Sequence, residues 1–138
     1  MINEHYTIAP VRTLEELTDN KSVVEHYLRK ALTKAPEYSL REVLKSIYDG
    51  LSVLWLIREG DVVIGAFTVK VYDYPNTRIL MLHLLGGDKI EEWLHLLSKV
   101  EDYGRDLGCD MVEMHGRYAW KKLLPDYKSD RIILNKVL

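Results

Sequence analysis

The segment from residue 78 to residue 115 constrains the fold more than any other part of the chain. An apolar strand, Arg78 to Leu85, leads through two glycines into an amphipathic helix, Asp88 to Leu107, and then into a second strand, Asp110 to His115. A strand, a long helix and another strand form a crossover, so we expect the two strands to lie parallel in one sheet. The first of these two strands is apolar on both faces, which is typical of a central strand covered by helices on both sides.

Changes of hydrophobic period predict the other elements. Ser39 and Glu42 have the spacing of a capping box, and Gly65 indicates a bulge. The expected elements are an edge strand over 7–11, helices over 21–34 and 39–50, strands over 53–58 and 62–71 joined by a hairpin at 59–61, a short helix over 117–124 and a last strand over 131–138. This order predicts one α/β (α+β) domain over 1–138, with a mixed, mostly antiparallel sheet and helices on both faces.

Composition limits the classes of function that need to be considered. The chain has 138 residues, 47% of them hydrophobic and 29% charged, and a formal net charge of −2. These values indicate one folded domain, and they give no overall attraction to nucleic acid or to an anionic membrane. No apolar run is long enough to span a bilayer, and the single cysteine, Cys109, excludes an internal disulfide. We therefore expect a cytoplasmic protein that does not contact membranes.

The element order from residue 21 to residue 138 resembles that of the GNAT superfamily, the acetyl-CoA-dependent N-acetyltransferases. A second resemblance is carried by the stretch from Leu107 to Arg117, with its Gly116-Arg117 pair, and by the following Trp120. That stretch is similar to small acetyltransferase-like proteins encoded by tailed phages and prophages. The second resemblance places the chain in a bacterial host cytoplasm or in a virion.

The GNAT resemblance implies a sheet whose two central parallel strands splay apart in a V. It implies that acetyl-CoA lies in this split, with its pantetheine arm along the backbone of the first strand and its pyrophosphate at the start of the long helix, where free N–H groups attract anions. The cofactor-binding residues implied in this way are Leu82, Leu84, Leu85, Gly86, Gly87 and Lys89. The acetyl acceptor would be a small-molecule or protein amine.

The phosphate loop of this chain departs from the pattern of the superfamily. Gly86 matches, but His83 stands where the pattern has glutamine or arginine, and Asp88 stands where it has a small residue. Asp88, Glu91 and Glu92 also crowd the first turn of the predicted helix, where carboxylates compete with a phosphate for the same positive end. Two interpretations follow: a helix capped by Asp88 after an ordinary Gly-Gly turn, or a working phosphate cradle.

The candidate catalytic residues are His83, His115 and Glu113. The superfamily often supplies a tyrosine as general acid, but the matching position here is Leu123. Acetyl transfer requires the loss of a proton from the amine, and histidine titrates in the right range. The two histidines end strands that should be neighbours. The alternative is that each one only ends its strand and bonds to backbone. No spacing of ligand residues indicates a metal site.

The sequence leaves several functions open. The first is acetyl transfer from acetyl-CoA to an amine. The alternative is a non-catalytic GNAT-like phage protein that is a virion component or binds a host protein. Nucleic-acid binding is disfavoured by the net charge, although five basic residues gather around the predicted short helix: Arg117, Lys121, Lys122, Lys128 and Arg131. The sequence does not predict an oligomeric state.

Overall fold

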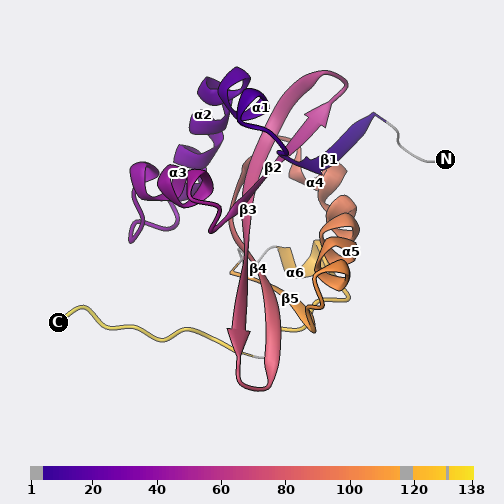
Figure 1. Cartoon of the computed structure of the whole chain (residues 1–138). Coiled ribbons are helices and arrows are strands. Elements are labelled where there is room, and N and C mark those ends of the chain that lie inside the picture. The colour runs from indigo at the N-terminus through magenta and orange to yellow at the C-terminus, as the bar shows by residue number, and fades with distance from the viewer. Residues whose placement is uncertain (1–4, 116–119, 130) are drawn as a thin grey trace.

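The computed structural model describes residues 5–115, 120–129 and 131–138, and it contains a five-stranded sheet (Figure 1). The strands are β1 (Tyr6–Pro10), β2 (Val53–Glu59), β3 (Val62–Tyr74), β4 (Thr77–Gly87) and β5 (Met111–Met114), in that spatial order. β1 to β4 pair antiparallel, and β4 pairs with β5 in parallel. The predicted mixed sheet and its parallel crossover are confirmed.

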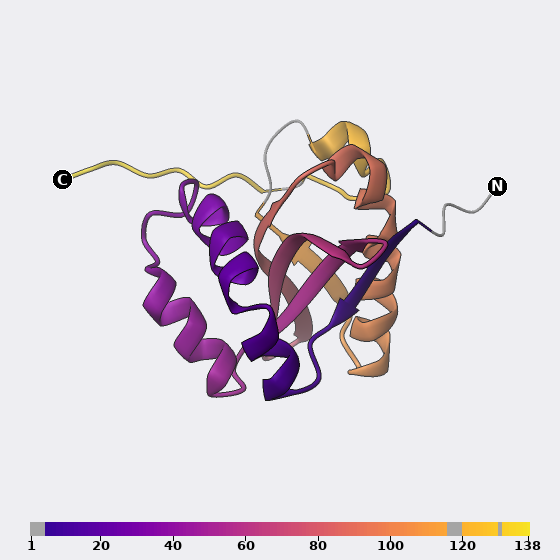
Figure 2. The same cartoon turned by 90° about the horizontal axis from the view of Figure 1, so that it is seen from above.

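Helices cover both faces of the sheet (Figure 2). One face carries α1 (Leu14–Asp19), α2 (Lys21–Leu32) and α3 (Leu40–Tyr48); the other carries α4 (Ile90–Trp93), the 3₁₀ helix η1 (Leu94–Leu97) and α5 (Ser98–Asp106). A short α6 (Trp120–Leu123) follows β5. Each layer has its own apolar core, centred on Leu28 and Leu54 on the first face and on Trp93 and Phe67 on the second. Among the described residues, no helix has the length and apolarity needed to cross a bilayer.

Several local predictions are confirmed. The Ser39 side chain accepts a hydrogen bond from the backbone of Glu42, and Glu42 reaches back to the Ser39 backbone, as a capping box requires. β1 is an edge strand, which accommodates Pro10. The register of β2 and β3 shifts next to Gly65, as in a bulge. α1 was not predicted, although Thr13 and Glu16 carry a signal for it, because the Thr13 side chain caps the Glu16 N–H.

The predicted continuous helix over 88–107 is wrong, because its first half is broken. α4 has only four residues and passes through η1 before α5 begins. Trp93, Leu94 and Leu97 are all buried against the sheet. The tighter 3₁₀ winding aligns residues three apart, so Leu94 and Leu97 share one face in a way that a regular α-helix reproduces less closely. The density of apolar residues over this turn therefore explains the change of winding.

Three other expectations also need correction. Gly86 and Gly87 do not form a turn but are the last two residues of β4, and the N-cap of α4 is Lys89 rather than Asp88. The predicted helix over 117–124 is observed only as Trp120–Leu123, and its start lies outside the described residues. The predicted strand over 131–138 is absent: this segment has no regular structure and extends away from the sheet (Figure 1). A strand requires a hydrogen-bonding partner, and the segment has none in the described part of the molecule.

Candidate functional site

The sheet opens between β4 and β5, where the predicted split lies. Their pairing ends at Leu82 and Met114, whereas the pairing of β4 with β3 continues to Gly87. Within the described residues, the backbone of β4 from His83 to Gly87 thus has no strand partner on the β5 side. This free edge supplies backbone donors and acceptors for an extended ligand.

His83 lies at the point where the two strands part. Val69 of β3 pairs with Leu82 and Thr68 pairs with Leu84, so His83 is the extra residue of a β-bulge. A bulge locally redirects the strand and its side chains. A pocket occupies the split at this place, and it brings residues from β4, the end of α2, β5 and α6 together: Leu82, His83, Leu84, Leu85, Ala31, Lys34, Ala35, His115 and Trp120.

The two histidines predicted from their strand ends line the same pocket. The pKa of His83 lies below its usual value, mainly because burial disfavours the charged imidazolium and also because of the nearby positive charges of His115 and Lys70. His83 is consequently neutral at pH 7 and has the protonation state of a general base.

The other side chains around His83 differ in how directly they reach the pocket. Glu113 of β5 lies 4.0 Å from the Nε2 atom of His115 and is outside the pocket lining. Tyr38 contacts His83 directly, with its hydroxyl 3.1 Å from the His83 Nε2 atom and the two rings edge to face. Sequence reasoning missed Tyr38, because it belongs to the loop between α2 and α3, and no motif records which strand end that loop contacts. Leu123, at the position of the absent tyrosine, lies on α6 and is partly exposed.

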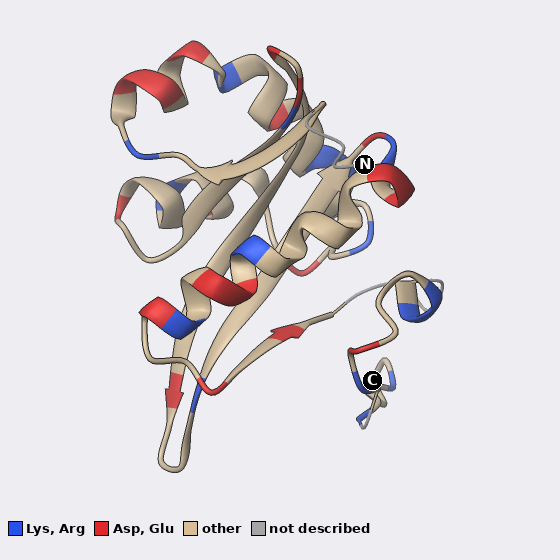
Figure 3. Ribbon diagram, turned by 90° about the vertical axis from the view of Figure 1, so that its right-hand side faces the viewer, with Lys and Arg blue, Asp and Glu red and all other residues tan. Residues whose placement is uncertain are grey.

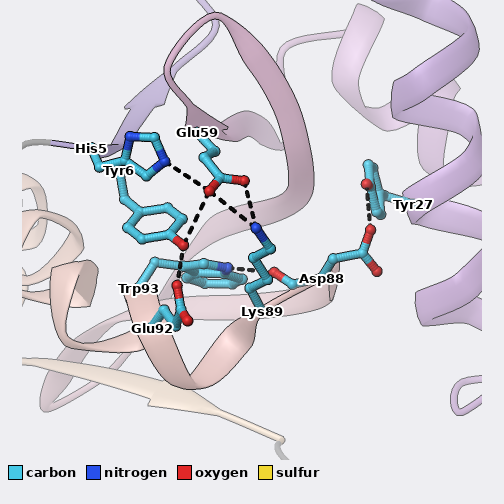
Figure 4. A network of polar contacts seen from close by, with 8 residues as sticks. All are labelled: His5, Tyr6, Tyr27, Glu59, Asp88, Lys89, Glu92 and Trp93. Atoms are coloured by element: carbon cyan, nitrogen blue, oxygen red, sulfur yellow. Dashed lines mark hydrogen bonds and ion pairs between the residues drawn. The ribbon is translucent and has the colours of Figure 1, made fainter.

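At the start of α4, Asp88 connects the two layers of the molecule (Figure 4). Its carboxylate accepts hydrogen bonds from the Tyr27 hydroxyl at 2.8 Å and from the Lys30 ammonium at 2.9 Å, both on α2. The bonds from Lys30 and Tyr27 lower the pKa of Asp88. Burial, together with the bond to Asp88, raises the pKa of Tyr27 to about 12. The backbone N–H of Asp88 donates to the carbonyl of Ile64. Asp88 therefore attaches the end of β4 to α2 and does not cap α4.

Lys89 continues this network on the other side (Figure 4). It adopts a left-handed backbone conformation with φ +57°, and its ammonium binds both oxygens of Glu59 at 2.9 and 3.0 Å. Glu59 also accepts a hydrogen bond from His5, and the hydroxyl of Tyr6 donates to Glu92. The positive charge of Lys89 is thus compensated by an adjacent carboxylate, whose pKa it lowers.

Both glycines at the end of β4 permit close packing. A Cβ atom at Gly86 would overlap the carbonyl oxygen of Tyr27, and one at Gly87 would lie 3.0 Å from the Trp93 ring and 3.2 Å from the Cα atom of Gly65. Position 86 requires glycine because the backbone of α2 packs onto the strand there. Position 87 requires glycine because the Trp93 ring and the backbone of the neighbouring strand β3 are close. This accounts for the pair without reference to a ligand.

Solved structures show the same arrangement of elements. No family model matches the sequence, and no curated protein is significantly similar to it. An aminoglycoside acetyltransferase from an uncultured soil sample, solved with sisomicin, aligns with a TM-score of 0.68 and 12% identity over 100% of this chain and 99% of its own. Glucosamine-6-phosphate N-acetyltransferase from Arabidopsis thaliana aligns with a TM-score of 0.65 and 12% identity over 97% and 99%. A predicted acetyltransferase from Clostridium acetobutylicum, solved with acetyl-CoA, aligns with a TM-score of 0.65 and 10% identity over 94% and 96%.

The chain has the fold of the GNAT acetyltransferases. At these identities the likeness establishes the fold alone. One solved structure of this fold contains acetyl-CoA. The split and the start of α4 are the two parts of this chain to compare with the two ends of that molecule.

The two ends of acetyl-CoA differ in how well this site suits them. The split suits the pantetheine arm, because the free edge of β4 supplies hydrogen bonds and Leu82, Leu84 and Leu85 supply apolar contact. The start of α4 suits the pyrophosphate less well. Asp88, Glu91 and Glu92 line the hollow there, and Figure 3 shows the acidic residues of this turn in red. Binding through the thioester end is therefore better supported than binding through the nucleotide end.

Proposed function

We propose that this protein is an N-acetyltransferase that transfers the acetyl group of acetyl-CoA to an amine in the split between β4 and β5. The observation that carries the proposal is the free backbone edge from His83 to Gly87, which lies beside a pocket lined by two histidines. An extended thioester ligand matches such an edge, and amine acylation requires a base near neutrality.

The roles of the residues follow from their positions. When bound, the thioester would supply an activated acetyl group for amide formation. Leu82, Leu84, Leu85 and the backbone of Gly86 and Gly87 would hold the pantetheine arm along β4. His83, kept neutral by burial, would accept the proton that the amine nitrogen releases, and Tyr38 would orient its imidazole through the hydroxyl contact. His115, beside Glu113, is the second group available for proton transfer in the pocket.

The acceptor is proposed as an amine on a small molecule or a protein. Neighbours of the same fold include enzymes whose names specify aminoglycosides and glucosamine-6-phosphate as amine substrates. We infer that the amine is uncharged when it reacts, because only the unprotonated nitrogen is nucleophilic. The neutral His83 would accept the proton that the amine loses.

Titration calorimetry with acetyl-CoA, followed by thiol-release assays on a panel of amines, tests the proposal. We expect heat of binding for acetyl-CoA, and thiol release that depends on both the amine and His83. The absence of binding at near-millimolar acetyl-CoA would overturn the proposal and favour the non-catalytic alternative, in which the fold binds a host or virion protein. Binding without turnover on any amine, together with unaltered binding in His83→Gln, would reject the catalytic role alone.

A further inference from the structure

The pocket in the split has a lysine in its lining and, among the described residues that line it, no aspartate or glutamate. Lys34 follows the end of α2 and is exposed, so it stands at the mouth of the pocket that His83 and His115 also line. Within the described part of the chain Lys34 makes no ion pair. Its ammonium can therefore bind an anion that enters the pocket.

Lys70 of β3 adds a second positive charge near His83. It pairs with Met81 of β4, and its ammonium lies 5.2 Å from the centre of the Tyr72 ring. Burial and the charge of His115 are the larger causes that lower the pKa of His83, and the charge of Lys70 comes next, which shows that this ammonium acts on the imidazole. An aromatic ring restrains a cation without neutralising its charge.

Two carboxylates near these cations do not cancel them. Glu113 faces His115 at 4.0 Å and lies outside the pocket lining. Glu37, in the loop between α2 and α3, opposes the cations, but its influence on the pKa of His83 is smaller than that of either His115 or Lys70. The surroundings of His83 are therefore electropositive, and such a pocket concentrates negatively charged ligands.

The size of the pocket limits how much of an acceptor it can enclose. Its volume is about 70 Å³, and Ala31, Ala35 and Trp120 contribute to its walls. Pockets that enclose drug-sized ligands measure about 300–1,000 Å³, so this pocket can take only the amino end of an acceptor. The atoms next to the amine must then lie at the mouth, where Lys34 stands.

Given the proposed acetyl transfer, we propose that the acceptor carries a carboxylate or a phosphate close to its amine, and that Lys34 and Lys70 bind this anionic group. Hydrogen bonds from an ammonium to carboxylate or phosphate oxygens are charge-assisted, and they would fix the acceptor with its nitrogen toward His83. Polycationic amines would be poor acceptors, because like charges would meet at the mouth of the pocket.

Three small amines test this preference. Ethanolamine has no charge besides its amine, β-alanine adds a carboxylate, and O-phosphoethanolamine adds a phosphate. With kcat/KM expressed per unprotonated amine, we expect at least one anionic amine to exceed ethanolamine by about tenfold at low salt, and by less at high salt. The two anionic amines distinguish carboxylate from phosphate. An equal or higher kcat/KM for ethanolamine would overturn the anionic acceptor and leave acetyl transfer standing.

Charge substitutions identify the residues that produce the preference. Lys34→Gln should reduce it by about threefold or more, and Lys34→Glu should reverse it. Lys99→Gln is the matched control, because Lys99 is an exposed lysine of α5, outside the pocket lining. A preference that persists in the double variant with Lys34→Glu and Lys70→Gln would overturn the assignment of the two lysines.

Binding can also be measured without turnover. The imidazole NMR signals of His83 and His115, assigned with His83→Gln and His115→Gln, report on the pocket when acetyl-CoA is absent. β-Alanine or O-phosphoethanolamine should shift these signals at lower concentration than ethanolamine does, and this difference should be lost in the double variant. Such shifts without acetylation of any amine would reject the proposed enzyme activity alone. The same response to all three amines would overturn the anion site.

Discussion

At the scale of single residues, Gly86 marks the closest approach between the two layers of the molecule. The backbone of α2 meets the end of β4 there, and a methyl group has no space. We expect Gly86→Ala to lower the free energy of unfolding by about 1–3 kcal/mol or more, because neither backbone segment can move without disturbing the sheet. Denaturant unfolding followed by circular dichroism measures the change.

Gly104 in α5 is the matched control for this substitution. A Cβ atom there would lie at ordinary contact distance from Leu80, 3.4 Å away. Since alanine is the better helix former, Gly104→Ala should leave the protein unchanged or stabilise it by about 0.5–1 kcal/mol. If the two variants lost similar stability, close packing at Gly86 would not be the cause.

His83 permits a second residue-scale prediction, which rests on the proposed function. Its pKa lies below the usual histidine value of about 6.5, so protonation removes the base only as the pH falls below that value. We expect kcat/KM to be on its plateau at pH 7 and to decline on the acid side. His83→Gln should lower kcat/KM by about 10²–10⁴-fold.

The control for His83 is His95, an exposed histidine of η1. His95→Gln should retain the activity and the acid limb of the pH profile. An acid limb above pH 7 in the unaltered protein, or one that persists in His83→Gln, would contradict the assignment of His83 as base.

The sequence predicts part of this site and misses the rest. His83 and His115 follow from topology alone, because the ends of neighbouring parallel strands must come together. The bulge at His83 and the Tyr38 contact do not follow, since both depend on how the α2–α3 loop and β3 settle against β4. The assignment of Asp88 as a cap fails because Tyr27 and Lys30, distant in sequence, bind its carboxylate instead.

At the scale of elements, the acidic first turn of α4 bears on the proposed binding of acetyl-CoA. Glu91 is exposed there beside Asp88 and Glu92. A charge near a helix start is worth about 0.3–1 kcal/mol, so we expect Glu91→Lys to tighten acetyl-CoA binding about two- to tenfold at low salt, less at high salt. Calorimetry at two ionic strengths measures this effect.

Glu15→Lys in α1 makes the same change of net charge at another helix start. It should leave the affinity unaltered. An equal gain in both variants would mean that overall charge, not the α4 turn, limits binding. A loss of affinity in Glu91→Lys would show that the cofactor approaches the turn differently from the proposal.

The elements also show where local sequence signals are sufficient. The capping box at Ser39 predicts the start of α3 correctly, because its two hydrogen bonds lie within four residues. The break in the helix after Trp93 is not predictable in the same way. It reflects the packing of three neighbouring apolar side chains against a sheet whose position the local sequence does not contain.

At the scale of the whole molecule, two carboxylates join the layers on either side of the sheet. Asp88 connects β4 to α2, and Glu59 connects the β2–β3 hairpin to Lys89. Both have pKa values below their usual range, chiefly because of the hydrogen bonds from Lys30 and Lys89. Their contribution to stability is present above the usual carboxyl pKa of about 4 and is lost as the pH falls through the lowered values.

We therefore expect the melting temperature to fall steeply below about pH 4, and the combined Asp88→Asn and Glu59→Gln variant to show a flatter pH dependence and a lower melting temperature at pH 7. Scanning calorimetry across this range measures both effects. Glu15→Gln is the control and should keep the slope of the unaltered protein. An unchanged slope in the double variant would show that other carboxylates dominate.

The overall topology is the part of the structure that the sequence predicts best. Alternation, helical period and the crossover define the strand order and the parallel pair. The segment 131–138 is the clear failure, and its cause is physical: strand propensity resides in the residues, but a strand forms only where a partner edge is within reach.

The connection from β4 to α4 consists of Asp88 and Lys89 alone. A longer connection would have to keep Trp93, which is fully buried four residues after Lys89, in its place in the core. An engineer who wished to strengthen phosphate binding would therefore have to substitute residues at constant loop length. Lys89 is a residue to keep in such a design, because its removal would take the ammonium partner from Glu59 and add net negative charge near the hollow.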